Sequence, residues 1–219
     1  MGKKNDNPLL SEILDLKKLQ AVDNIIDKAK GLPNECYTSN EYLKIEKDKI
    51  FCDKWTVIGV GSSIPNIGDA KPFEILGIPL VIIRGKDRKI RVFHNVCSHR
   101  GLKLLNEPCA LKNVLSCPYH SWSYDFKGSL VATPHIGGLN IHKLDSFDKS
   151  KSNLKEVRSK IWMDIIFINL NNNQIEFDDY IKPLEKRWSK FIRKEDQDLI
   201  KHAKDYGYIS LNIKSNWKF

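Results

Sequence analysis

The sequence predicts a mostly β protein, in which a small antiparallel β domain follows an N-terminal helix and precedes an α+β segment. Three observations support this fold class. Short β-branched or aromatic runs, separated by glycines, begin at Trp55. Apolar residues between Ser11 and Ala29 recur with helical spacing. After a polar link rich in Lys and Ser, at about residues 145–159, a strand-like run and a helical run follow one another.

Residues 1–36 form the predicted N-terminal helical segment. Its apolar positions are Leu16, Leu19, Val22, Ile25, Ile26 and Ala29. This spacing is typical of the buried stripe of an amphipathic helix. Gly31 and Pro33 then stop the pattern. We therefore expect one continuous helix over Ser11–Ala29.

Residues 37–160 are predicted to form the β domain. Its first four strand-like runs are Trp55–Val60, Phe73–Leu76, Leu80–Arg84 and Lys89–Asn95. Gly85-Lys86-Asp87 predicts a turn between the last two. A further strand pair, Trp122–Asp125 and Leu130–Thr133, flanks a turn that contains Lys127-Gly128. Such short connections favour antiparallel pairing.

Residues 161–219 predict mixed structure. Ile161–Leu170 resembles a single buried strand, Phe177–Ile192 is expected to be a helix, and Tyr208–Ile213 is expected to begin another strand. Ile161–Leu170 is also the longest apolar run, and it contains Asp164 and is too short to span a membrane. The polar N-terminus lacks the apolar centre of a signal peptide. We therefore expect a cytoplasmic protein without a membrane partner.

The composition is that of a globular protein with excess positive charge. Hydrophobic residues make up 41% of the 219 residues, and the formal net charge is +9. The lysines are scattered along the chain, so the positive charge is explained by the overall composition without a basic binding face. No nucleic-acid partner is therefore expected. The alternative is a functional basic face. The chain has five cysteines, which in a reducing cytosol favours metal binding over disulfides.

Two short segments carry the metal-binding chemistry. Cys97-Ser98-His99 and Cys117-Pro118-Tyr119-His120 each offer one thiolate and one imidazole, and residues 100–116 separate them. Two Cys and two His could hold structural zinc, but a zinc finger usually takes both Cys from one segment and both His from the other. A Rieske [2Fe–2S] cluster needs the mixture, because one iron takes two thiolates and the other takes two imidazoles. We expect Cys97, His99, Cys117 and His120 to be its ligands.

The pattern C-x-H-x17-C-x2-H resembles the Rieske domain of non-haem iron ring-hydroxylating oxygenase α subunits. The flanking residues Asn95–Gly101 and Cys117–Trp122 are similar to that family's cluster loops, and the resemblance extends from about Tyr37 to the end. It implies a helical segment over residues 1–36, a Rieske domain over 37–160 and the truncated start of a catalytic domain over 161–219.

The loops resemble the oxygenase type more than the respiratory type of Rieske protein. Tyr119 stands where the respiratory loop has a disulfide-bonded cysteine. The respiratory type also has a Ser and a Tyr that donate hydrogen bonds to the cluster sulfurs, and we expect these donors to be missing here. Both differences predict a reduction potential near the bottom of the Rieske range.

The resemblance implies an oxidoreductase, a mono- or dioxygenase α subunit that is a homotrimer when full length. A ferredoxin or a flavin reductase would supply electrons, and His120 would be their exit from the cluster. They would reach a mononuclear Fe(II) that hydroxylates or demethylates a small organic substrate, with aromatic acids and quaternary ammonium compounds equally open. Trp122 would shield the cluster or pack in the core, and Arg100 would fix its loop or be a surface residue.

The family's mononuclear iron ligands follow shortly after an Asn-Trp-Lys segment, and this sequence ends at Asn216-Trp217-Lys218-Phe219. We therefore expect no catalytic residue and no mononuclear iron site in this chain. The remaining histidines are expected to be surface or packing residues: His94, His135, His142 and His202. The other three cysteines are expected to be ordinary thiols: Cys36, Cys52 and Cys109. The alternative function is a stand-alone Rieske ferredoxin that only carries electrons.

Overall fold

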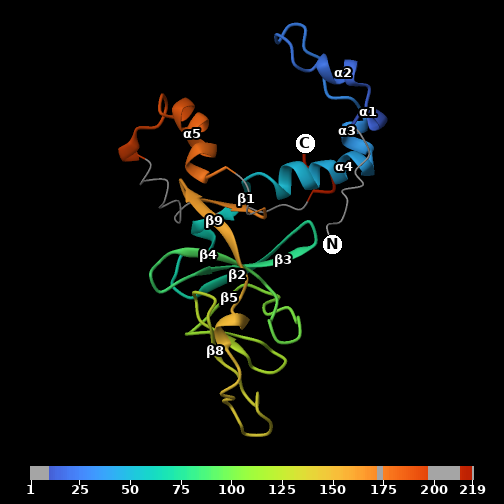
Figure 1. Ribbon diagram of the computed structural model, residues 1–219. Helices are drawn as coiled ribbons and strands as arrows, with labels where there is room; N and C mark the ends of the chain where they lie inside the picture. Colours follow the sequence, from blue (N-terminus) through green and yellow to red (C-terminus); the bar gives the residue numbers. More distant parts are fainter. Residues whose placement is uncertain (1–9, 172–174, 197–212, 219) are drawn as a thin grey trace. The chain divides into compact units, whose positions relative to one another are not determined.

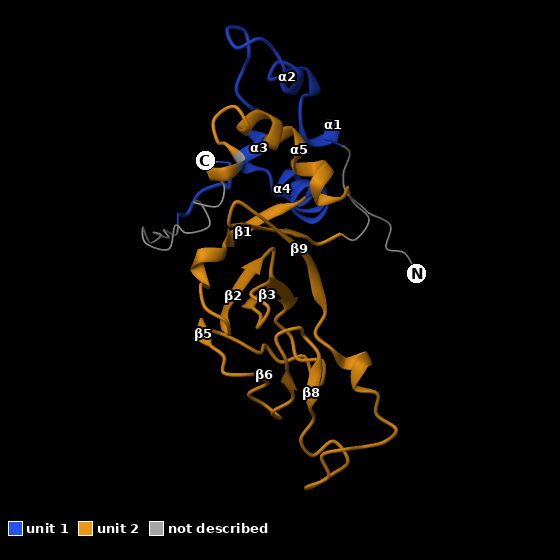
Figure 2. Cartoon of the chain, turned by 90° about the vertical axis from the view of Figure 1, so that its left-hand side faces the viewer, with its two compact units in different colours: residues 1–54, 209–219 blue, residues 55–208 orange. Residues whose placement is uncertain are grey.

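The computed structural model describes residues 10–171, 175–196 and 213–218 of the chain. The chain divides into two compact units, shown in Figure 2. One, here called the helical unit, combines residues 1–54 with 209–219, and the other, here called the β unit, contains residues 55–208. The predicted boundaries at residues 36 and 160 do not coincide with the limits of these units, and as family-domain boundaries they stay predictions.

The expected continuous helix over Ser11–Ala29 is wrong. Two short helices, α1 (Leu10–Ile13) and α2 (Leu16–Gln20), occupy its first part, and turns follow. The Asp15 carboxylate accepts hydrogen bonds from the backbone N–H groups of Lys17 and Lys18 and so caps a new helix. Among the periodic apolar residues, Ile26 is 89% exposed, so the predicted stripe buries little. The local N-cap at Asp15 therefore interrupts the helix that the apolar spacing predicted.

The rest of the helical unit packs around a buried carboxylate. It contains α3 (Glu35–Thr38), α4 (Asn40–Glu46) and a π-helical turn over Lys47–Cys52. Glu46, only 4% exposed, accepts hydrogen bonds from the Trp217 indole at 3.1 Å and from the Lys218 ammonium at 2.9 Å. A buried carboxylate is costly unless it is paired. This contact therefore ties the last described segment to α4.

All described strands lie in the β unit and pair antiparallel (Figure 1). The larger sheet has seven strands in the order β1 (Thr56–Val60), β10 (Ile165–Asn169), β9 (Glu156–Trp162), β4 (Ile90–His94), β3 (Ile78–Arg84), β2 (Asp69–Ile75) and β5 (Cys109–Ala110). The smaller sheet has three, β6 (Leu115–Ser116), β7 (Ser123–Tyr124) and β8 (Leu130–Ala132). The predicted mostly β fold and its early strands are confirmed, although β2 begins before the expected Phe73.

Strand β3 is buried on both faces, which accounts for its unbroken run of apolar residues. Leu80 and Ile82 face one hydrophobic core, whereas Val81 and Ile83 face another, and all four are at most 2% exposed. Successive strand residues point to opposite faces, so a strand buried on both faces has no polar alternation. The core that contains Val81 and Ile83 also holds Cys97 and Cys117, so this strand helps to build the core in which two of the candidate ligands are buried.

The expected single strand Ile161–Leu170 is also wrong, because the run is a hairpin. Met163 and Asp164 form its two-residue turn, with φ angles of 49° and 64°, and join β9 to β10. Such turns usually carry Asn-Gly or Asp-Gly, so Met-Asp gave no sequence signal. Asp164 fixes the turn by accepting a hydrogen bond from the Ser62 N–H at 2.8 Å. Since β9 starts at Glu156, the polar link is also shorter than expected.

The segment after the hairpin contains α5 (Phe177–Trp188), which confirms the predicted helix but ends before Ile192. Phe177 and Ile181 bury its inner face against Trp55 and Phe167. The strand predicted over Tyr208–Ile213 lies outside the described residues except for its last residue. Within the described ranges, no helix has the length and apolar character required to cross a membrane.

Candidate metal centre

The two segments that contain the candidate ligands form the same loop twice. In the first, the Cys97 N–H donates to the Leu102 carbonyl at 2.8 Å, and the Gly101 N–H donates to the Cys97 carbonyl at 2.9 Å. In the second, the Cys117 N–H donates to the carbonyl five residues later, at 2.8 Å, and the Ser121 N–H donates to the Cys117 carbonyl at 3.0 Å. The matching pattern gives both cysteines equivalent places, whereas His99 follows its cysteine by two residues and His120 follows its cysteine by three.

Each loop needs one residue in the left-handed region, four positions after its cysteine. Gly101 has a φ of 72° and Ser121 a φ of 56°. Only glycine adopts this conformation without a steric cost, so Ser121 is strained where Gly101 is not. The loops follow β4 and β6, and the smaller sheet lies at the end of the β unit opposite α5 (Figure 1).

The thiols point inward and the imidazoles outward. Cys97 and Cys117 are 2% and 3% exposed within the core, whereas His99 is exposed and His120 is half-buried. The two imidazole ring centroids lie 4.8 Å apart. This arrangement places both soft sulfur ligands in the same core below the surface and both imidazoles close together at it. One iron bound by two thiolates and another bound by two imidazoles need this division.

One atom tests whether the residues fit such a cluster. Nδ1 of His120 is buried and has no hydrogen-bond partner. A buried ring nitrogen without a partner costs free energy, and imidazole nitrogen is a good ligand for iron. A bond from Nδ1 to iron would satisfy it, so the described residues fit a [2Fe–2S] cluster.

The expectation that hydroxyl donors are missing is wrong. The Tyr124 hydroxyl lies 3.3 Å from the Cys97 sulfur and 2.8 Å from the Ser98 hydroxyl. Burial, with Cys97 next to it, raises the pKa of Tyr124 to about 12, so its hydroxyl keeps its proton. The prediction of a low potential therefore loses one support, and only the replacement of a disulfide cysteine by Tyr119 remains. The sequence signal that was missed is a tyrosine four residues after the second histidine.

Aromatic rings cover both histidines. Trp122 stacks on His99 with ring centroids 4.5 Å apart and planes 9° apart, and Phe147 meets Trp122 edge-on. Tyr119 lies against His120 at 3.7 Å. Burial lowers the pKa of His99, and the charges of His120 and an adjacent arginine lower it further. Trp122 is 5% exposed and belongs to the core, so it both packs and covers a candidate ligand.

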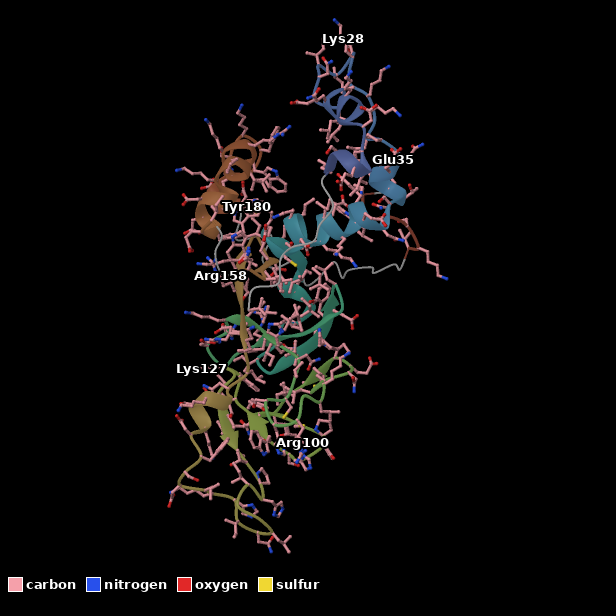
Figure 3. The ribbon with its side chains drawn as sticks, turned by 45° about the vertical axis from the view of Figure 1, so that its right-hand side comes forward. Lys28, Glu35, Arg100, Lys127, Arg158 and Tyr180 are labelled. Atoms are coloured by element: carbon pink, nitrogen blue, oxygen red, sulfur yellow. The ribbon has the colours of Figure 1, made fainter. Side chains whose placement is uncertain are left out.

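The histidine face opens to an external pocket of about 560 Å³. Its lining includes His99, His120, Tyr119 and Trp122. Arg100, next to His99, is exposed, and Figure 3 places it among the loops at the end of the β unit opposite Tyr180 of α5. The imidazole side of the site is therefore more accessible from outside than the sulfur side.

The other histidines and cysteines have different surroundings. Nδ1 of His135 accepts a hydrogen bond from the Asn140 N–H, and Nδ1 of His142 accepts one from the His135 N–H, so this pair braces its own loop. Burial lowers the pKa of half-buried His94. The fourth, His202, lies outside the described residues. The remaining thiols are free and lie on separate elements: Cys36 on α3, Cys52 in the π-helical turn and Cys109 on β5.

Comparison with known proteins agrees with this geometry. Residues 54–147 match the family model of the Rieske [2Fe-2S] domain. The oxygenase subunit of carnitine monooxygenase from Acinetobacter pittii (strain PHEA-2) is 32% identical over 192 residues, covering 88% of this chain and 49% of that protein. The α subunit of 2-aminobenzenesulfonate 2,3-dioxygenase from Alcaligenes sp is 29% identical over 188 residues, covering 85% and 45%.

Solved structures give the same result. The quaternary ammonium Rieske monooxygenase CntA, in complex with its substrate gamma-butyrobetaine, matches with a TM-score of 0.63 and 33% identity, covering 73% of this chain and 44% of that one. The fold and the paired loops therefore define a Rieske iron–sulfur protein. More particularly, its Rieske [2Fe–2S] domain is that of the oxygenase α subunits, and a structural zinc site is not supported. The chain spans about half the length of the curated relatives it matches.

Proposed function

We propose that Cys97, His99, Cys117 and His120 hold the [2Fe–2S] cluster and that this chain is the electron-transfer portion of an oxygenase α subunit. The observation that carries the proposal is the pair of matching loops, which places two buried thiols in one core and two outward imidazoles 4.8 Å apart. When bound, the cluster supplies one-electron transfer. The chain's own residues hold it, exclude water from its sulfur side and leave its nitrogen side open.

In the full-length protein, a ferredoxin or flavin reductase would supply the electrons. His120 is the proposed exit, because its ring lines the open pocket while its Nδ1 is turned into the protein. The acceptor would be a mononuclear Fe(II), in a cytoplasmic homotrimer that hydroxylates or demethylates a small organic molecule. The relatives include both a carnitine monooxygenase and an aromatic dioxygenase, so the substrate class stays open.

A stand-alone ferredoxin is the less well-supported function. The similarity to an oxygenase subunit extends over 192 residues, well beyond the matched residues 54–147 of the Rieske domain. A protein that only carried electrons would not need the helical unit or α5.

Titration with dithionite should reduce the 219-residue chain by one electron. Incubation of the reduced chain with Fe(II), O₂ and candidate substrates should give no product, and catalytic turnover would contradict this.

The ligand assignment is tested by replacing cysteines. Protein purified without oxygen should be brown and contain about two irons and two acid-labile sulfides per chain. Cys97→Ser and Cys117→Ser should abolish the cluster. The matched controls are Cys36→Ser, Cys52→Ser and Cys109→Ser, which should keep the visible spectrum. A colourless wild-type protein that contains one zinc would refute the proposal, as would a brown Cys97→Ser variant with full iron content.

A further inference from the structure

The Ser98 hydroxyl already uses its only hydrogen in a hydrogen bond. Its Oγ lies 2.6 Å from the Ser152 carbonyl oxygen, which can only accept a hydrogen bond. Ser98 must therefore be the donor in that contact. The same Oγ lies 2.8 Å from the Tyr124 hydroxyl. Because the Ser98 hydrogen is already donated elsewhere, Ser98 can only accept a hydrogen bond from Tyr124.

The hydroxyl of Tyr124 thus has one hydrogen and two acceptors. One acceptor is Ser98 Oγ at 2.8 Å, and the other is the Cys97 sulfur at 3.3 Å. A cysteine that binds iron is a thiolate and has no hydrogen to donate. The Ser98 backbone N–H also donates to the Tyr124 oxygen, at 3.0 Å, and holds the phenol in place between both acceptors. The two acceptors therefore compete for one proton.

We propose that Ser98 is a positioning residue that lowers the reduction potential of the cluster by drawing the Tyr124 proton away from Cys97. This inference rests on the proposed function, because it requires Cys97 to be a ligand. A hydrogen bond to a ligand sulfur stabilises the more negative, reduced cluster and raises its potential. The more the Tyr124 hydroxyl donates to Ser98 instead of Cys97, the lower the reduction potential of the cluster is expected to be. Ser98 acts through Tyr124 and does not itself contact iron.

The geometry of this competition is set by a distant part of the chain. Ser152 is the last residue of a 3₁₀ turn, Lys149–Ser152, and lies 54 positions beyond Ser98. Tyr124 is fully buried on β7, so it cannot turn to another partner in solvent. Two elements outside the first ligand loop thus determine how strongly its sulfur is hydrogen-bonded.

The test measures reduction potentials by protein-film voltammetry on the cluster-containing 219-residue protein. Ser98→Ala removes the competing acceptor and should raise the potential. Tyr124→Phe removes the donor and should lower it. The double variant should match Tyr124→Phe alone, since Ser98 has nothing to compete for without the phenol. Either shift should change the ratio of reduced to oxidised protein at a fixed potential by up to about tenfold, equivalent to about 59 mV for one electron.

Two further comparisons keep the test decisive. Ser98→Thr keeps the hydroxyl, and Ser98→Val has the same shape without it, so the Val variant should have the higher potential even if the Ala variant loses its cluster. Ser116→Ala is the matched control: it removes a hydroxyl next to the other cysteine, Cys117, where Ser116 hydrogen-bonds Ser123. Its potential should equal that of the wild type.

The outcomes separate the two proposals. An intact cluster whose potential falls or stays constant in Ser98→Ala, or is equal in the Thr and Val variants, overturns the role of Ser98 and leaves the ligand assignment standing. A shift of the same size in the Tyr124→Phe background also overturns it, because the effect would then not pass through Tyr124. A wild-type protein without iron and sulfide would instead refute the proposed function.

Discussion

The two ligand loops have the same backbone but different residues at its most demanding point. Gly101 and Ser121 occupy equivalent left-handed positions, and only Ser121 carries a side chain there. Their aromatic covers differ as well: Trp122, over His99, is 5% exposed, whereas Tyr119, over His120, is 61% exposed. The loop geometry therefore depends on the ring of hydrogen bonds around each cysteine more than on a particular glycine.

The largest expected difference concerns the two aromatic covers. Trp122→Ala should destabilise the protein by about 3 to 5 kcal/mol, because it leaves a large cavity in the core that also holds Cys97. Tyr119→Ala removes an exposed ring and should stay within about 0.5 kcal/mol of the wild type. Urea denaturation followed by circular dichroism measures both. Equal losses in the two variants would show that the covers have the same structural role.

The second prediction exchanges the residues at the left-handed positions. Gly101→Ala should lower the free energy of unfolding by about 1 to 2 kcal/mol, because a residue with a Cβ is strained in this backbone conformation. No clash adds to this cost, since the new Cβ would meet no other atom within 4 Å. Ser121→Gly relieves a similar strain but gives the unfolded chain more freedom, so a net gain of about 0.5 to 1 kcal/mol is expected. Denaturation midpoints test the opposite signs, and a destabilised Ser121→Gly variant would contradict the strain argument.

The smallest effect concerns pH at the base of the first loop. His94, at the end of β4, has a pKa lowered by burial and by Lys155, so the folded protein disfavours its charged form. The corresponding stability is present above the unfolded pKa of about 6.5 and is lost as the pH falls below it. His94→Gln should flatten the stability profile below about pH 6.5. An unchanged slope in the variant would assign the titration to another group.

How much the sequence predicts depends on whether a signal is local. The mixed Cys/His segments and the β7–β8 hairpin were predictable because their spacing and turn residues carry the information. The Met163-Asp164 turn was not, since neither residue is typical of it, and its stability depends on Ser62, a hundred positions away. The helix over Ser11–Ala29 failed because Asp15 caps locally.

The site followed the same rule. Its four candidate ligands could be named from their spacing, and the comparisons support the type of domain that they define. Tyr124 and its link through Ser98 to Ser152 could not, because a hydroxyl shared by three segments leaves no periodic trace in the sequence. The groups that would tune a metal centre are thus harder to recognise than those that would bind it.

The contact between Glu46 and Lys218 has a consequence for how the chain could be divided. These residues are 172 positions apart, yet they belong to one unit, so the β unit is an insertion within the sequence of the helical unit. Both ends of an insertion can be cut and rejoined without interrupting its own pairing. A gene segment that begins at Trp55 and includes α5 therefore keeps every described strand pair intact.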